Sequence, residues 1–168
     1  IVAINLKLAK LAYENKVYEA ANFDVISVVN LALDFYSQIF ISSPATRIVG
    51  EREREVTMGI RIKDNTEATV TIANVNMRGR DMPVIEIGEN SKLILRLEGE
   101  NVLSYEGITV PQSSKLVIQG EGNLTVHVDH NNGVGIGSSG TNPYGMITFE
   151  QTGTVRVETN GDTAIGIG

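Results

Sequence analysis

The chain has 168 residues, enough for one domain with a sizeable core, and carries a formal net charge of −6 with 20% charged residues. This acidity disfavours a nucleic-acid partner, because phosphate binding needs a basic face. The absence of cysteine excludes disulfides, thiolate zinc sites and a cysteine nucleophile, and no apolar run is long enough to predict a membrane-spanning helix.

Residues 1–46 contain no glycine, and for them we predict a region that caps the fold that follows. Its first residues fit a helix, with Ile4 and Leu8 on one face, but they also alternate as a strand would. Good helix formers, without glycine or proline, favour a helix over roughly residues 5–20. Residues 25–40 are apolar and partly β-branched, which fits a helix, a strand or one of each.

From residue 47 to 168 the sequence is a repeat, and it holds all 17 glycines. A first sub-motif is a pair of apolar residues one residue apart, at spacings of 25, 23, 26 and 31: Ile60/Ile62, Ile85/Ile87, Ile108/Val110, Val134/Ile136 and Ile165/Ile167. A second is a polar lead-in and an alternating apolar run, aligned on Thr69, Leu93, Leu116 and Met146. A third is a turn and a strand at residues 98–103, 121–126 and 152–157.

Three motifs in fixed order predict an all-β fold, a parallel β-helix of about four coils with three short strands in each. Inward Ile, Val and Leu would then stack on like residues of the next coil, ~4.8 Å away. An antiparallel sandwich also has short strands, but it does not require motifs to recur in one order. The longest coil places its extra residues at 138–145, whose Ser, Gly, Asn and Pro are typical of a loop.

The C-terminal end of the repeat stops at AIGIG, in the opening strand of a new coil. We expect the natural protein to continue beyond this point, or this open end to pair with another copy, because an open solenoid end exposes strand edges and apolar core.

The stretches VIEIGENSKLILRLEGENVL and GITVPQSSKLVIQGEGNLTV, with GMITFEQTGTVRVET and the GVGIG and AIGIG strands, resemble the repeats of bacterial surface proteins. These are adhesin-like, right-handed single-stranded parallel β-helix proteins, some described as carbohydrate-binding domains, and they are distantly similar in fold to pectate lyases. The resemblance covers roughly residues 47–168. It implies a secreted or cell-surface location, although the first residues lack a signal-peptide pattern.

The most polar loop of the repeat runs from residue 127 to 132. Asp129, Asn131 and Asn132 offer oxygen ligands for Ca²⁺, and His127 and His130 are candidates for sugar contact or a transition metal. The alternative interpretation is a solvated corner, because Asp and Asn favour turns.

Aromatic side chains are candidate platforms for the CH faces of a sugar. Tyr144, in the inserted loop after Pro143, is the best of them, and Tyr105 is a second candidate. A lyase site needs Ca²⁺-binding acids and a basic residue, for which Arg78 and Arg80, with Asp129, supply the plausible parts.

The leading functional hypothesis is a non-catalytic surface module, adhesin-like, that binds polysaccharide or a cell-surface glycan. Its alternative is a Ca²⁺-dependent polysaccharide lyase of pectate-lyase-like fold. The run from residue 51 to 55 alternates in charge, and we interpret it as a solvated loop or edge.

Overall fold

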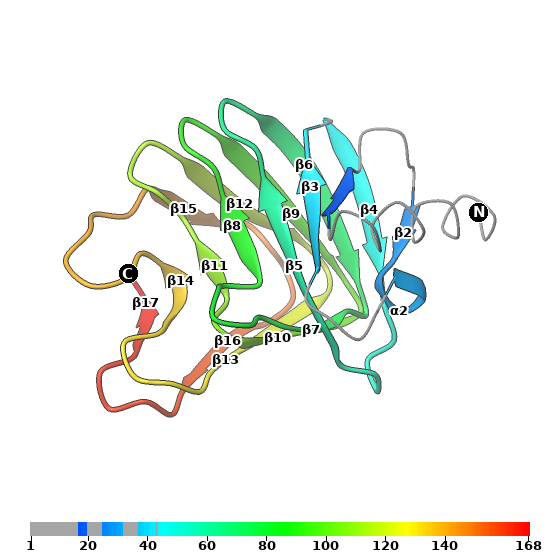
Figure 1. Cartoon of the computed structure of the whole chain (residues 1–168). Coiled ribbons are helices and arrows are strands. Elements are labelled where there is room, and N and C mark those ends of the chain that lie inside the picture. Colours follow the sequence, from blue (N-terminus) through cyan, green and yellow to red (C-terminus); the bar gives the residue numbers. More distant parts are fainter. Residues whose placement is uncertain (1–16, 20–24, 32–36, 43) are drawn as a thin grey trace.

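The computed structural model describes residues 17–19, 25–31, 37–42 and 44–168. In this part of the chain nearly every element is a β-strand, and all pairings between named strands are parallel. The strands stack coil upon coil into a solenoid of about four turns, which confirms the predicted fold class (Figure 1). No helix in the described residues is long and apolar enough to cross a membrane.

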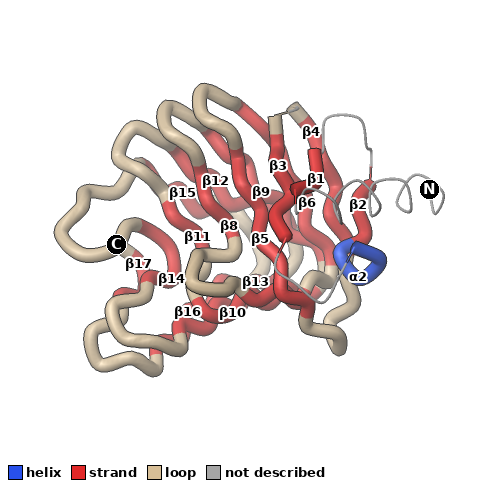
Figure 2. Tube along the Cα trace, in the orientation of Figure 1, coloured by secondary structure: helices blue, strands red, loops and turns tan. Residues whose placement is uncertain are grey.

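Each full coil runs over three faces, which we name A, B and C in chain order (Figure 2). The A face contains β1 (Val17–Glu19), β3 (Ser37–Ile41), β5 (Val56–Ile62), β8 (Ile85–Ile87), β11 (Ile108–Thr109), β14 (Val134–Gly137) and β17 (Ile165–Ile167). The B face contains β2 (Val25–Ser27), β4 (Ala45–Val49), β6 (Glu67–Ala73), β9 (Lys92–Glu98), β12 (Lys115–Gly120) and β15 (Met146–Phe149). The C face contains the start of β5, then β7 (Asn76–Arg78), β10 (Glu100–Tyr105), β13 (Asn123–Val128) and β16 (Val155–Thr159).

The interior is filled by columns of inward side chains, one from each coil. These columns follow from the two-residue period of a strand, which sends alternate side chains to opposite faces of the sheet. The central members of the columns are fully buried, and one column from each face reads Ile60–Ile85–Ile108–Ile136, Val70–Leu95–Ile118 and Met77–Leu103–Val126.

Corners between faces are held by buried polar side chains that bond to the neighbouring coils. Ser114 Oγ donates to the carbonyl of Gly88 at 2.7 Å and accepts the N–H of Ser91 at 3.1 Å. At the next corner, Asn101 Oδ1 accepts the N–H of Val75 at 3.1 Å. Because buried backbone groups need hydrogen-bond partners, these side chains fix the position of each turn relative to the neighbouring coils.

On the A face three of the four predicted steps of the register hold, and one step is shifted by two residues. Ile108 pairs with Ile136, not with Val134. A two-residue slip keeps the same side chains inward, so the alternating pattern alone does not reveal it.

On the B face two of the four predicted anchors are displaced by one residue, which reverses their direction. Met146 pairs with Lys115 and points outward, 60% exposed. Thr69 also points outward, and its neighbour Ala68 fills the inward position, 1% exposed. An exposed methionine and a small inward alanine mislead an alignment that relies on apolar character.

Strands before residue 47 belong to the same stack, since β2 pairs with β4 and β3 pairs with β5. The helix in the described residues is a single turn, α2 (Val28–Leu31). The helix predicted over residues 5–20 lies outside the described residues except for Val17–Glu19, which form strand β1 and so differ from the prediction.

Candidate functional site

Two corners of the solenoid bring together the chemistry that the sequence analysis singled out. The C–A corner comprises the loops at residues 79–84, 105–107 and 129–133, which follow successive strands of the C face. The A–B edge comprises the turns at residues 63–66, 88–91 and 110–114 and the inserted loop 138–145. In Figure 1 that inserted loop is the orange segment between β14 and β15, which projects from the C-terminal end of the stack.

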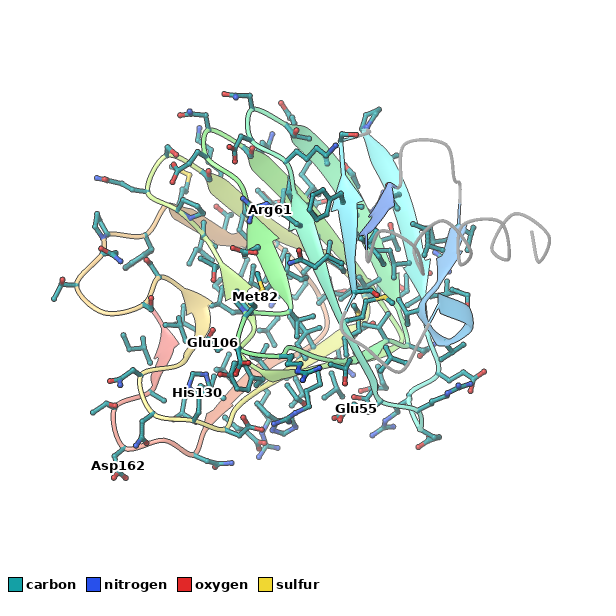
Figure 3. The ribbon with its side chains drawn as sticks, in the orientation of Figure 1. Glu55, Arg61, Met82, Glu106, His130 and Asp162 are labelled. Carbon is teal, nitrogen blue, oxygen red and sulfur yellow. The ribbon has the colours of Figure 1, made fainter. Side chains whose placement is uncertain are left out.

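At the C–A corner the ring of Tyr105 stacks on the ring of His130, with centroids 4.2 Å apart and planes inclined by 23°. Tyr105 has a φ of +86°, a left-handed conformation that is uncommon for a bulky residue. His130 Nε2 lies 3.4 Å from Glu106 Oε1, and Figure 3 shows both side chains at this corner. The stacking joins two of the predicted sugar-binding residues from successive coils.

Glu106 gives the C–A corner its least solvated carboxyl group, whose oxygen Oε1 accepts the N–H of Val134 at 3.2 Å. Burial raises the pKa of Glu106 above its usual range, although the charge of His130 and the hydrogen bond from Val134 act to lower it. Burial also raises the pKa of Tyr105, and the negative charges of Asp81 and Glu106 add to that rise.

Polar contacts on the C face engage other predicted residues. Arg78 bonds to Asp129 at 2.7 Å, although the two residues lie two coils apart in the chain. His127 Nδ1 lies 2.8 Å from Glu158 Oε2, on the neighbouring strand β16. Arg78 and Asp129 thus lie side by side, as a lyase site would need, but the carboxylate of Asp129 is already paired with the guanidinium group of Arg78.

Asn131 and Asn132, the other predicted Ca²⁺ ligands, bond to the following coil. The N–H of Asp162 donates to Asn131 Oδ1 at 3.1 Å, and Thr163 Oγ1 donates to Asn132 Oδ1 at 2.8 Å. Among the described residues no group of three or more His, Cys, Asp or Glu side chains is arranged to hold a metal ion. The oxygen atoms of this loop therefore serve as contacts between coils.

A polar hollow of about 430 Å³ lies on the A–B edge, beside the inserted loop. It is lined by Glu89, Thr109, Pro111, Gln112, Ser113, Ser138, Ser139, Asn142 and Pro143. Tyr144 follows Pro143 directly, its backbone bridges to Pro111, and it is 51% exposed. The predicted aromatic platform thus stands beside hydroxyl, amide and carboxyl groups.

A second hollow, of about 370 Å³, opens on the B-face side of the same edge. It is lined by Asn65, Thr66, Glu67, Asn90, Ser91, Lys92 and Lys115. Both hollows are shallow and open to solvent, as a site for a long chain would be.

A third hollow, of about 510 Å³, lies at the corner between the B and C faces, where several glycines leave space. Two of its carboxylates already have partners, because Glu98 pairs with Arg47 at 2.6 Å and Glu100 accepts from Asn123 at 2.6 Å. No aromatic side chain lines this hollow; none lines the two hollows of the A–B edge either, but there Tyr144 follows the lining residue Pro143 directly.

The residues predicted from the sequence included neither Glu106 at the C–A corner nor the two lysines at the A–B edge. The lysines had a visible signal, because the aligned stretches NSKL and SSKL each carry a lysine at the same position. Glu106 had none, since its partner His130 comes from a loop and not from a repeated strand position.

No protein-family model matches this chain, and neither a curated protein nor a solved structure shows a significant similarity to it.

Proposed function

We propose that the chain is a non-catalytic β-solenoid module that binds polysaccharide along its A–B edge, in the manner of a surface adhesin. The observation that carries the proposal is the union of two polar hollows with the exposed Tyr144 on one edge. Sugars combine hydroxyl groups with apolar CH faces, so they favour hydroxyl and amide partners beside an aromatic ring.

The rigid stack suits such a role. Each strand of the interior coils is paired on both sides, so the turns that carry the hollows are held at fixed spacing. An open edge with repeated turns admits a chain of many sugars, whereas an enclosed pocket admits only a chain end. The proposed role implies a secreted or cell-surface location, which immunolabelling of intact and permeabilised source cells would test.

A glycan array tests the proposal, with Tyr144→Ala, Tyr144→Phe and Phe149→Ala as variants. Phe149 is a matched control, because it is a similarly exposed aromatic of the same coil that pairs with the inward Ile118 instead of lining the edge. We expect Tyr144→Ala to weaken binding about tenfold, or about 1.4 kcal/mol, while the other two variants bind nearly as the wild type does. Silence across plant, host and microbial glycans, or full binding by Tyr144→Ala, would contradict the proposal.

A second candidate function is polysaccharide cleavage at the C–A corner, favoured by the half-buried Glu106 beside His130 and Tyr105. A carboxyl group whose pKa is raised is suited to proton transfer near neutral pH. Ultraviolet absorbance of unsaturated uronates, followed with pectin or alginate and added Ca²⁺, tests this candidate. A rise that Glu106→Gln abolishes would support it, and a flat trace would exclude it for these substrates.

A further inference from the structure

Two lysines stand on adjacent rungs at the A–B edge. Lys92 and Lys115 are direct partners in the pairing of β9 with β12, so their strands lie ~4.8 Å apart. The same outward row begins at Glu67 and ends at Met146. The row therefore crosses four coils in the order carboxylate, ammonium, ammonium, thioether.

Among the described residues, only Lys92 of this pair has a counter-charge at ion-pair distance. Lys92 Nζ lies 3.0 Å from Glu67 Oε1. In the described part of the chain Lys115 makes no ion pair, and it is exposed. Like charges directly opposite on neighbouring strands are destabilising, and this pair occurs in a chain of net charge −6. The row is thus a local positive site on an acidic protein.

The surroundings of the lysine pair are those of a ligand site. Both lysines line the hollow of about 370 Å³ together with the amides of Asn65 and Asn90, the hydroxyls of Thr66 and Ser91, and the carboxylate of Glu67 that pairs with Lys92. Ser91 Oγ donates its hydrogen to the carbonyl of Lys63 at 2.8 Å and accepts the N–H of Thr66 at 3.0 Å, so it shapes the turn and is not a free donor. The asparagine amides and the two ammonium groups are the donors that line this open space.

We propose that the glycan bound at the A–B edge is acidic, with a carboxylate or sulfate group held between Lys92 and Lys115. This inference rests on the proposed function. The rung spacing of ~4.8 Å is similar to the length of one pyranose residue. A glycan that runs along the solenoid axis places successive sugars over Lys92, Lys115 and Met146, and it ends beside Tyr144.

Calorimetric titrations with oligomers of polygalacturonate and hyaluronan, their carboxyl-reduced neutral forms, and dextran sulfate test the proposal. We expect carboxyl reduction and Lys115→Gln each to weaken binding about tenfold, and added salt to weaken it further. Glu67→Gln frees Lys92 from its counter-charge, and we expect it to tighten binding two- to threefold. Preference for the uronates or for dextran sulfate separates the two kinds of anion.

Arg54→Gln is the matched control, because Arg54 is an exposed cation in the turn at residues 51–55, away from the edge. It removes the same charge and should change affinity less than twofold. Equal binding of the acidic and neutral forms, with Tyr144→Ala still weakening both, would overturn the acidic specificity and leave the proposed function standing. Absence of binding to every glycan would overturn both.

Discussion

Replacing Leu95 by alanine tests the inward columns of the stack, with Ile94→Ala as its matched control. The two residues are neighbours on β9, but Leu95 is fully buried between Val70 and Ile118, whereas Ile94 points outward and is half-buried. Leu95→Ala removes three carbon groups, or about 2.4 kcal/mol at ~0.8 kcal/mol each. The cavity that remains raises the expected loss to about 3–4 kcal/mol.

Ile94→Ala should cost about 0.5–1 kcal/mol, because its side chain is partly solvated in the folded state. Urea unfolding followed by circular dichroism measures both values. With a slope of ~2 kcal/mol per molar urea, Leu95→Ala lowers the midpoint by about 1.5–2 M and Ile94→Ala by less than about 0.5 M. Equal losses in the two variants, or a larger loss in Ile94→Ala, would refute the assignment of inward and outward positions on the B face.

Three further predictions concern the corners and the last coil. Gly107→Ala should destabilise the fold by about 1–3 kcal/mol, since a Cβ there would lie 2.0 Å from the carbonyl oxygen of Gly135. Gly166→Ala, in the same column, should cost little, because its Cβ would meet only a methyl group of Val157 at 4.0 Å. Thermal melts compare the two variants. Glu106→Gln keeps an oxygen that accepts the N–H of Val134, but it removes the carboxyl group, whose pKa is raised by burial. Its stability should equal that of the wild type at acidic pH. It should begin to exceed the wild type as the pH rises above the ordinary pKa of an unfolded glutamate, and the difference should be complete above the raised pKa of folded Glu106, where the wild type bears a desolvated charge. A variant less stable at every pH would contradict this account. Phe149 is 41% exposed on the last coil, and Phe149→Lys should reduce any concentration-dependent self-association that sedimentation velocity detects for residues 1–168; unchanged association would place the contact elsewhere.

The fold could be predicted from the sequence because every coil of a solenoid needs the same kinds of residue at equivalent positions. Each coil places inward aliphatic residues at equivalent positions, so the fixed order of the three sub-motifs indicated a stack of coils. The turn-and-strand motif was even aligned in the correct register, with Leu103 paired to Val126 and Val126 to Val157.

The apolar pattern also predicted most of the A-face register and the pairing of Leu93 with Leu116, but it could not decide every step. Ile108 finds apolar candidates at both Val134 and Ile136, and the pattern holds no preference between them. The structure decides through the Glu106–Gly107 turn, whose Gly107 accepts close approach of the next coil at Gly135. The pattern of apolar residues does not show how closely two backbone segments approach each other at a corner.

The candidate sites were predictable only where a residue type is unusual for its position. Tyr144 stood out as an aromatic in a loop, and the structure leaves it exposed beside a polar hollow. The ion pair of Arg78 with Asp129 joins two residues that the sequence offered as parts of a lyase site. Glu106 was missed because its environment depends on a loop from another coil, which folds His130 back over it.

Chemical-shift mapping of the ¹⁵N-labelled chain with an acidic glycan oligomer tests the central claim most directly. Binding at the A–B edge predicts perturbed amides around Ser91 and Lys92, around Lys115, and in the inserted loop near Tyr144. The amides of Tyr105 and His130 should stay unmoved in the same titration. Perturbations that gather at the C–A corner instead, or an unchanged spectrum at saturating glycan, would contradict the account.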